Sequence, residues 1–168
     1  MRSLFATSFA LFLAVHSTFA RAADDTNPPQ FTPSPVAGSD SYLARAQEVV
    51  LNAMGFLGIP YRWGGSTPEA GFDCAGLVQY VFRQALGTLL PRSSYDMGVM
   101  GLSVSHTDLL PGDLVFFNTL RRPFSHVGIY IGENRFIHAP RRGKTVEIVD
   151  MSGSYWQQRY NGARRLAQ

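Results

Sequence analysis

The sequence predicts an α+β domain in which helices precede an antiparallel sheet. Apolar residues recur at helical spacing in two segments of the first half of the chain, residues 41–57 and 74–86. After Pro111 and Gly112 the pattern changes to short runs of β-branched and aromatic residues separated by Gly, Asn and Pro. The two patterns are segregated and no internal repeat is present, which favours α+β over an alternating fold or a solenoid.

The first helix is expected over residues 41–54. Gly55, Gly58 and Pro60 follow it and close the segment. The apolar face that the spacing predicts consists of Leu43, Ala46, Val50, Ala53, Met54 and Leu57.

The second helix has clearer ends. Asp73 is a preferred N-cap residue, and Gly87 is a preferred C-terminal stop. These boundaries place Cys74 in the first turn, and a further short helical turn is expected at residues 94–100. The apolar stripe of the second helix consists of Leu77, Val78, Val81, Phe82 and Ala85.

Four strands are expected in the second half of the chain, over residues 113–117, 126–131, 135–139 and 145–149. Short connections join most of them, which favours antiparallel pairing of neighbouring strands. Together with the preceding helices they complete the α+β architecture.

The first 22 residues read as a secretory signal peptide. Arg2 is followed by an apolar run over residues 4–15 and then by small residues. We expect cleavage after Ala22, with Ala20 as the alternative. The apolar run is shorter than the roughly 20 residues that span a bilayer, and no cysteine follows the signal to carry a lipid anchor. The mature protein is therefore expected to be periplasmic or secreted, without stable membrane insertion.

Composition sets the expected domain boundaries. Residues 23–39 are rich in Pro, Ser and Thr and poor in core-forming residues, which predicts a flexible linker. The folded domain is then expected over residues 40–168. Its size suits one globular domain.

The net charge argues against a nucleic-acid partner. Removal of the signal takes away two arginines and lowers the formal charge from +3 to +1. The remaining basic residues are scattered, apart from Arg121 and Arg122 and the group Arg141, Arg142 and Lys144. These groups are interpreted first as solvated loops and second as a contact for an anionic polymer.

Cys74 is the only cysteine and a candidate nucleophile. Exported proteins commonly pair their cysteines in disulfides, so an unpaired cysteine calls for a reason such as catalysis. A helix N-terminus favours the thiolate, and a capping Asp73 directs its charge to backbone N–H groups instead of to the sulfur. The alternative is a structural cysteine in the core.

A thiol nucleophile needs a general base, usually a histidine. His16 belongs to the signal, and His106 is expected at the surface. His126 and His138 stand among apolar residues on two expected strands, where an unpartnered imidazole is costly to bury. We expect His126 to act as general base and acid and His138 to bond its far nitrogen and fix its tautomer. Each taken singly could also be a structural histidine.

The two histidines meet only if the hairpin between their strands is irregular. A simple two-residue turn at residues 133–134 gives a register in which His126 and His138 project to opposite faces of the sheet. We therefore predict an odd-numbered loop or a β-bulge close to Gly132.

Other groups are expected to complete the site. Backbone N–H groups at the helix start, including that of Cys74, are candidates for an oxyanion hole. A turn at Gly64 and Gly65 could bring the Tyr61 hydroxyl or the Trp63 ring to the cleft, although Trp63 could equally belong to the core. No metal-ligand cluster and no phosphate-binding loop is present in the sequence, so no metal and no cofactor is expected.

A set of linked motifs carries a family resemblance: YRWGG, GFDCAGLVQYVF, LPRSSYDMG, PGDLVFF, HVGIYIG and RFIHA, with WQQRYNGARR near the end. Over residues 42–166 the chain resembles the NlpC/P60 cell-wall cysteine peptidases. The resemblance implies a papain-like α+β domain and a catalytic triad of Cys74, His126 and His138.

Within the same resemblance, Tyr61 corresponds to the tyrosine that lines the family's catalytic cleft. Trp63, Arg92 and Ser93 are the further candidates for substrate binding. The implied activity is peptidoglycan endopeptidase, a cysteine-type peptidase, and the nearest branch is the Spr-type murein endopeptidases of Gram-negative bacteria. That branch cuts between D-alanine and meso-diaminopimelate, while other branches cut the γ-D-glutamyl-diaminopimelate bond.

Some residues depart from the branch. Ala75 stands where the family often has serine, and Asp96 and Met97 stand where Spr-type proteins tend to have glutamines, at a surface expected to face the substrate. The alternatives are a non-catalytic peptidoglycan-binding module and an acyltransferase on the same fold. A regulatory adaptor is conceivable, and the sequence does not identify one.

Overall fold

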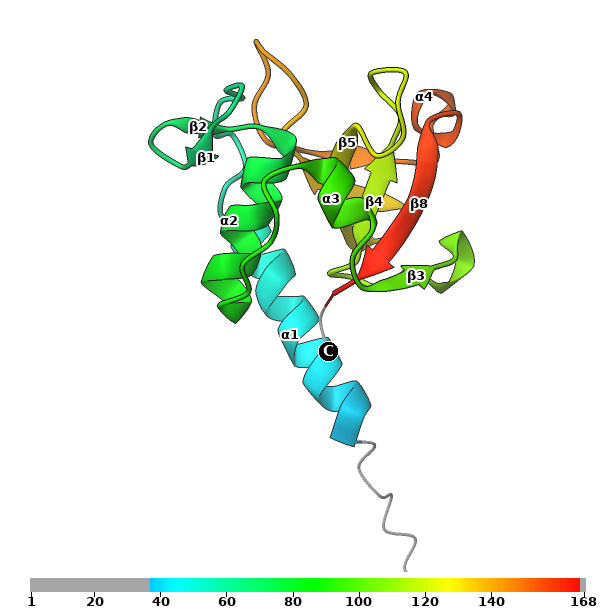
Figure 1. Ribbon diagram of the computed structural model, residues 1–168. Helices are drawn as coiled ribbons and strands as arrows, with labels where there is room; N and C mark the ends of the chain where they lie inside the picture. The colour runs from blue at the N-terminus through cyan, green and yellow to red at the C-terminus, as the bar shows by residue number, and fades with distance from the viewer. Residues whose placement is uncertain (1–36, 167–168) are drawn as a thin grey trace, which may run out of the picture. The chain divides into compact units, whose positions relative to one another are not determined.

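Helices come first along the described chain and an antiparallel sheet follows, which confirms the α+β prediction. The structure, a computed structural model, describes residues 37–166, with side chains from residue 41. The expected signal, residues 1–22, and the expected linker up to residue 36 lie outside the described residues. Figure 1 shows the two long helices, α1 (Ala37–Met54) and α2 (Cys74–Leu86), beside the sheet.

Helix α1 begins before residue 41 and buries a narrower face than its apolar spacing predicts. Ala46, Val49 and Ala53 are buried. A Cβ placed on Gly112 would lie 3.1 Å from the Cα of Ala46, so the helix meets the neighbouring loop through small side chains. Core positions are wrong for three of the expected residues, which are exposed: Leu43 and Met54 in α1 and Leu57 just after it.

Helix α2 has the expected ends. The Asp73 carboxylate accepts from the Gly76 N–H at 2.7 Å, which makes Asp73 the N-cap. Gly87 adopts the left-handed conformation with φ of 66°, and its N–H donates to the Arg83 carbonyl. Cys74 is consequently the first residue of the helix. Four members of the expected apolar stripe are buried: Leu77, Val78, Val81 and Phe82.

Six strands form one antiparallel sheet in the spatial order β3-β8-β4-β5-β6-β7. The four expected strands are present as β4 to β7, with the bounds Leu114–Phe117, His126–Gly132, Arg135–His138 and Glu147–Asp150. The sequence pattern does not predict the other two strands, β3 (Leu102–Val104) and β8 (Tyr160–Arg165).

Short elements connect these parts. Strands β1 and β2 form a small hairpin just before α2, and helix α3 falls within the helical turn expected at residues 94–100. The bounds are β1 Ser66–Thr67, β2 Gly71–Phe72, α3 Ser94–Gly98, the 3-10 turn η1 His106–Asp108, and α4 Ser154–Gln157.

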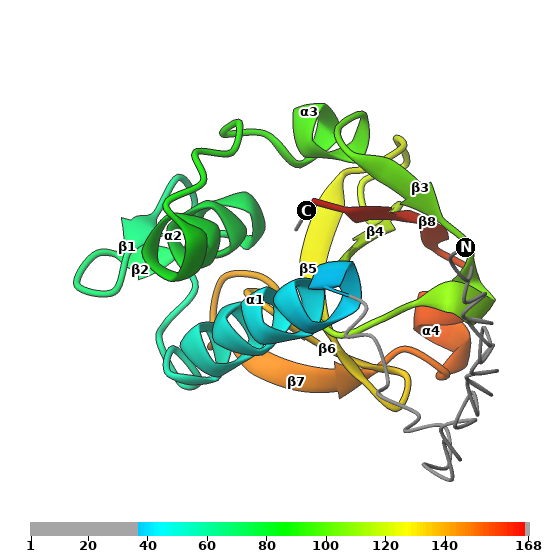
Figure 2. The same ribbon diagram turned by 90° about the horizontal axis from the view of Figure 1, so that it is seen from below.

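The two faces of the sheet carry separate apolar clusters. Leu114 and Phe116 of β4 belong to the cluster beneath α1 and α2, the helices that cover this face in Figure 2. Val115 and Phe117 point to the opposite face, where Phe117 meets Trp156 of α4. Because both faces are covered, every residue of β4 is buried.

A β-bulge at Ile131 lies in the hairpin between β5 and β6. Tyr130 pairs with Phe136 but Gly132 pairs with Arg135, so Ile131 is one extra residue in β5. The predicted irregularity close to Gly132 is confirmed. Because the bulge shifts the register by one residue, the histidines of β5 and β6 come to the same face of the sheet.

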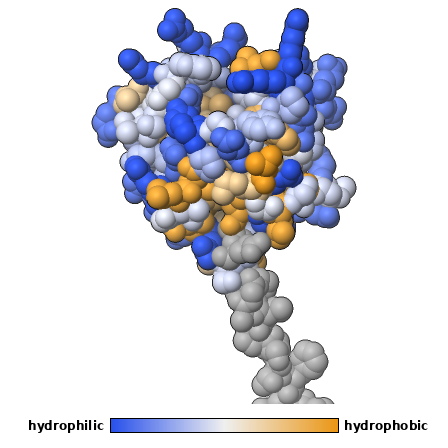
Figure 3. Space-filling view, viewed as in Figure 1, coloured by the Kyte–Doolittle hydropathy of each residue, from blue (hydrophilic) through white to orange (hydrophobic). Residues whose placement is uncertain are grey.

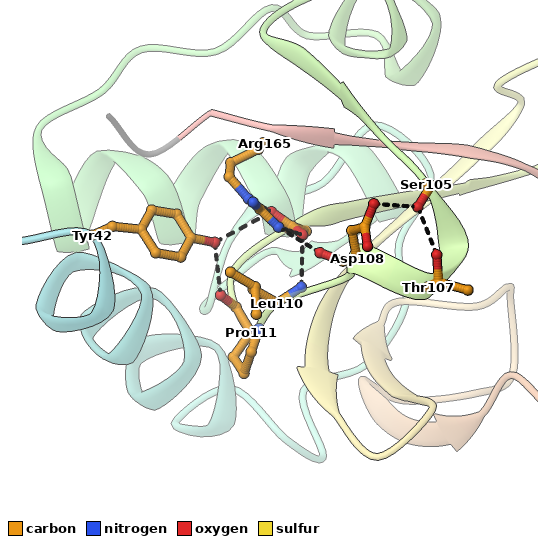
Figure 4. Close-up of polar contacts among 8 residues, drawn as sticks. Tyr42, Ser105, Thr107, Asp108, Leu110, Pro111 and Arg165 are labelled. Carbon is orange, nitrogen blue, oxygen red and sulfur yellow. Dashed lines mark hydrogen bonds and ion pairs between the residues drawn. The ribbon is translucent and has the colours of Figure 1, made fainter. Parts of the chain in front are cut away.

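A buried ion pair between Arg165 of β8 and Asp113 is also contacted by Tyr42 of α1. Arg165 donates to both carboxylate oxygens of the fully buried Asp113, at 2.8 and 2.7 Å. The Tyr42 hydroxyl lies 3.3 Å from the same carboxylate and 3.2 Å from the Pro111 carbonyl oxygen (Figure 4). Burial, followed by the charge of Asp113, raises the pKa of Tyr42 to about 12. The network joins segments that are far apart in the sequence.

Candidate active site

Cys74 occupies the N-terminus of α2, at the edge of the core, and is partly exposed. The backbone N–H groups of Val127 and Ala75 bond to its sulfur, and both act to lower the pKa of the thiol. Val127 follows His126 in β5, so the thiol lies beside the start of that strand. Cys74 is therefore not sealed within the core.

The Asp73 carboxylate connects the segments around Cys74. One oxygen accepts from the Gly76 N–H, and the other accepts from the Gly64 N–H at 3.0 Å and from Nη2 of Arg92 at 2.6 Å. Arg92, an expected substrate-binding residue, is thereby engaged with the helix cap. It is not among the described residues that line the Cys74 cavity.

Ser93 and His106 lie outside the Cys74 cavity as well. The Ser93 hydroxyl accepts from the Asp96 N–H at 3.1 Å and donates to the Asp96 carboxylate at 2.6 Å, so it caps α3. His106 is exposed, as expected, and its ring meets that of Tyr160 edge-on at 5.2 Å.

His126 and His138 meet on one face of the β5-β6 hairpin. Nε2 of His126 and Nδ1 of His138 are 2.7 Å apart, within hydrogen-bond range. Both residues are buried. Because Nε2 of His126 is engaged with His138, Nδ1 is the ring nitrogen that remains for the Cys74 thiol.

Trp156 covers the histidine pair and was not predicted from the sequence. Its ring stacks on His126 with the centroids 5.9 Å apart and meets His138 edge-on at 5.2 Å. Sequence patterns do not indicate this contact, because it depends on how α4 folds back on the sheet. The available signal was the WQQRYNGARR motif, which begins with this tryptophan.

Cys74 and His126 line the same cavity, which has a volume of about 400 Å³. Tyr61 and Trp63 line it as well, so both residues expected from the YRWGG motif reach the cleft. Trp63 is 76% exposed, which excludes the core position considered for it.

The loop after β4 forms another part of the cavity wall through Thr119 and Leu120. The Ser125 hydroxyl accepts from the backbone N–H groups of both residues, at 2.9 and 3.0 Å. Ser125 directly precedes His126, so the same residue fixes the loop and the start of β5.

Burial controls protonation in the site. Burial, followed by the charge of Asp73, raises the pKa of Cys74 to about 11. Burial lowers the pKa of His126 to about 4, and burial with the neighbouring charge of His126 lowers the pKa of His138 well below its usual range. The thiol and both imidazoles are thus neutral at pH 7. The expected lowering of the thiol pKa is wrong, because lost hydration outweighs the N–H groups at the sulfur.

No group of three or more His, Cys, Asp and Glu side chains within the described residues is arranged to hold a metal ion. Among residues 37–166, no helix is long and apolar enough to cross a membrane.

Comparison with known sequences places this geometry in context. The chain matches the model of the NlpC/P60 family over residues 58–165. The gamma-DL-glutamyl hydrolase of Bacillus subtilis (strain 168) is 50% identical over 119 residues, covering 70% of this chain and 29% of that protein. The murein DD-endopeptidase MepS/murein LD-carboxypeptidase of Escherichia coli (strain K12) is 49% identical over 109 residues, covering 65% of this chain and 56% of that protein. The chain thus spans only part of the length of these relatives.

Solved structures agree in fold. An NlpC/P60 family protein from Bacillus cereus ATCC 10987 superposes with a TM-score of 0.68 at 34% identity, over 73% of this chain and 40% of that one. The NlpC/p60 domain of the peptidoglycan hydrolase SagA superposes with a TM-score of 0.62 at 30% identity, over 72% of this chain and 98% of that one. Because the family match extends over more than half of the sequence and these structures share the fold, the chain belongs to the NlpC/P60 family.

Proposed function

We propose that this protein is a peptidoglycan endopeptidase that uses a thiol nucleophile. The observation that carries the proposal is that Cys74 and His126 line one cavity while His138 bonds the far nitrogen of His126. A nucleophile, a base and a group that orients the base are the three parts that thiol peptidases need.

In the first half of the reaction His126 Nδ1 accepts the Cys74 proton while the sulfur attacks the scissile carbonyl carbon. The new S–C bond pushes the carbonyl electron pair onto oxygen. The group that we propose for binding that oxyanion is the backbone N–H of Cys74, at the start of α2. Collapse of the intermediate breaks the C–N bond, and the His126 imidazolium gives its proton to the leaving amine.

In the second half a water molecule attacks the thioester. His126 accepts a proton from that water, and collapse of the second tetrahedral intermediate breaks the S–C bond. The proton on His126 returns to the sulfur and restores the neutral thiol, and the carboxylic acid product releases its remaining proton to solvent as it leaves as a carboxylate. Burial disfavours both the thiolate and the imidazolium in the resting site, which favours transfer of the Cys74 proton to His126 as the sulfur attacks.

Positive charge around the cavity favours an anionic substrate. Arg141 and Arg142 line the Cys74 cavity, and Lys144 lines a second cavity that shares His126 with it. None of the three has an ion-pair partner within residues 41–166. The loops after β4 and β6 project at the upper end of Figure 1, where hydrophilic side chains gather in Figure 3. Peptidoglycan stem peptides carry free carboxylates that fit such a rim.

For the scissile bond we propose the one between D-alanine and meso-diaminopimelate. The similarity to murein DD-endopeptidases supports it. The γ-D-glutamyl-diaminopimelate bond is the second candidate, which the 50% identity to a gamma-DL-glutamyl hydrolase favours. In either case Tyr61 and Trp63 are the proposed substrate contacts, because both line the Cys74 cavity.

Peptidoglycan lies outside the cytoplasm, so this activity requires export. We propose that residues 1–22 direct the protein to the periplasm or the exterior. The part of the expected linker that precedes α1, residues 23–36, then links them to the catalytic domain; residues 37–39 of the expected linker belong to α1. A regulatory adaptor is compatible with this function, and no partner is assigned.

The test is digestion of purified sacculi and of defined muropeptides by the purified protein beside a Cys74→Ala variant, with products identified by mass spectrometry. New termini at diaminopimelate crosslinks support the proposed bond, and new termini after D-glutamate support the second candidate. Binding without products would indicate a non-catalytic module. Products in which an amine replaces water as acceptor would indicate an acyltransferase.

A further inference from the structure

One nitrogen of the histidine pair lies buried without a hydrogen-bond partner. His138 is 1% exposed, and its Nε2 has no hydrogen-bond partner among the described residues. The Glu147 carboxylate lies close by, with its Oε1 3.8 Å from that nitrogen. The two residues are directly paired across β6 and β7. A buried polar atom in this position calls for an explanation.

The chemistry of His126 fixes which nitrogen of His138 carries the proton. To take the Cys74 proton, neutral His126 must keep Nδ1 bare, so its own proton sits on Nε2 and is donated to Nδ1 of His138. Nδ1 of His138 is then an acceptor. A neutral His138 must therefore carry its proton on Nε2, which becomes a buried donor that needs an acceptor.

We propose that Glu147 is that acceptor and serves as a positioning residue, holding His138 in the tautomer that leaves Nδ1 of His126 free for the thiol. The inference rests on the proposed function, since the direction of the proton relay comes from the thiol mechanism. Cys74, His126, His138 and Glu147 then form a chain in which each residue bonds to the next. Of these four residues, only Cys74 and His126 contact reacting atoms.

The surroundings of Glu147 allow this role. Its side chain is 40% exposed and therefore has room to move. A shift of the carboxylate by roughly 1 Å would shorten the 3.8 Å contact to hydrogen-bond distance. The other charged groups on this side of His138 are Arg141 and Lys144, which line the same cavity as Glu147. Both are cations and cannot accept a hydrogen bond, so Glu147 is the only charged acceptor among the described residues that line this cavity, and its Oε1 lies 3.8 Å from Nε2.

The first experiment reads the tautomers directly. The purified protein is labelled with ¹⁵N-histidine, and two-bond ¹⁵N–¹H correlation spectra are recorded at pH 7. We expect protons on Nε2 of both His126 and His138, and we expect the Glu147→Leu variant to populate the Nδ1–H tautomer of His138. A bare Nε2 on His138 in the unmodified protein would overturn the proposal.

The second experiment measures turnover of muropeptides. Glu147→Leu removes both acceptor and charge, and its kcat should fall about tenfold with KM unchanged, because Glu147 is not among the described residues that line the Cys74 cavity. Glu147→Gln keeps an acceptor oxygen and should retain more activity than Glu147→Leu. Glu133→Gln is the matched control for loss of an exposed carboxylate, since Glu133 pairs only with Arg135 at the tip of the hairpin. A Glu147→Leu variant within twofold of the parent would contradict the proposal.

A third readout does not depend on the substrate. The rate at which iodoacetamide alkylates Cys74 at pH 7 reports how well His126 accepts the thiol proton. Glu147→Leu should slow alkylation about tenfold, whereas Glu133→Gln should not change it. If the parent protein cleaves no muropeptide but these rates and tautomers behave as expected, the proposed substrate fails and the role of Glu147 stands. If muropeptides are cleaved but Glu147→Leu is alkylated at the same rate as the parent protein, the proposed role of Glu147 fails and the proposed substrate stands.

Discussion

Gly76 contacts Gly65 so closely that a Cβ added to Gly76 would lie 2.0 Å from the Gly65 carbonyl oxygen. The same pair of segments is joined by the Asp73 N–H, which donates to that carbonyl at 3.1 Å. The contact holds the first turn of α2, with Cys74, against the loop that carries Tyr61 and Trp63. Backbone contact of this kind positions the nucleophile relative to the cleft wall.

The Gly76→Ala substitution should therefore damage both stability and catalysis. The added methyl group must push two backbone segments apart, at a cost of roughly 1–3 kcal/mol in the free energy of unfolding. Urea unfolding and muropeptide turnover measure the two effects. Gly153→Ala is the matched control, because its Cβ would have 3.8 Å of clearance and its φ is −63°. Equal stability of the two variants would contradict the close contact.

Deletion of Ile131 should leave the histidine pair in place, because the bulge only accommodates this one extra residue in β5. The two residues that flank Ile131 keep their present partners as consecutive pairs, so His126 and His138 stay on one face of the sheet. An alanine inserted between Val127 and Gly128 should instead turn His126 to the opposite face, and we expect turnover to fall at least about 100-fold, the range for loss of a general base. Circular dichroism checks that both variants fold. A folded but inactive deletion variant beside an active insertion variant would contradict this view of the register.

Loss of the Asp113 carboxylate should destabilise the protein strongly. Asp113→Ala leaves Arg165 without its buried partner, and breaking such a pair costs about 3–5 kcal/mol. Tyr42→Phe removes one hydroxyl from the same network and should cost about 1 kcal/mol. Denaturant unfolding of the two variants tests this order, and a smaller loss for Asp113→Ala than for Tyr42→Phe would refute it.

The buried histidines should make the protein less stable in mild acid. Burial lowers the pKa of His126 in the folded protein to about 4, against an ordinary value of 6.5, so between these pH values the unfolded chain binds more protons than the folded chain. The shift corresponds to about 3 kcal/mol lost as the pH falls from about 7 to 4, and His138 acts in the same direction. Urea unfolding at pH 7 and pH 4.5 measures the loss. His126→Gln should reduce the slope, and an unchanged slope would argue against the buried neutral imidazole.

Neutralising the basic rim should weaken substrate binding more than chemistry. Replacing Arg141, Arg142 and Lys144 by glutamine removes the charges that face the cleft. We expect KM for muropeptides to rise about tenfold, equivalent to about 1.4 kcal/mol, while kcat stays unchanged. The KM of the variant should also depend less on salt concentration than that of the parent protein. Arg83→Gln is the control, because Arg83 lies in the last turn of α2 while Cys74 lies in the first. A rise in KM equal to that of the control would remove the electrostatic argument.

Local chemistry made part of this structure predictable. The cap at Asp73 and the stop at Gly87 depend on residues within one helix, so the sequence contains them in full. The bulge near Gly132 was predictable because two histidines with a shared task constrain the hairpin between them. Strand β8 was not, since its polar sequence YNGARR lacks strand alternation and its pairing with β3 and β4 is long-range.

Burial was the quantity that sequence patterns did not supply. The same helix N-terminus that favours a thiolate places Cys74 where lost hydration raises its pKa, and only the packed structure shows which effect is larger. Arg92 and Ser93 illustrate the same limit, because their motif predicts proximity to the site while the structure shows them bound to Asp73 and Asp96. Trp156 and Glu147 emerge only when α4 and β7 are placed beside the histidines.

The most direct test of the central claim is detection of an acyl group on Cys74. Crosslinked muropeptides are mixed with the purified protein, the reaction is quenched with acid within seconds, and digested peptides are examined by mass spectrometry. We expect a thioester adduct on the peptide that contains Cys74, with much less adduct in a His126→Ala variant. Turnover of muropeptides by Cys74→Ala at the parental rate, with no adduct on the parent protein, would contradict the central claim.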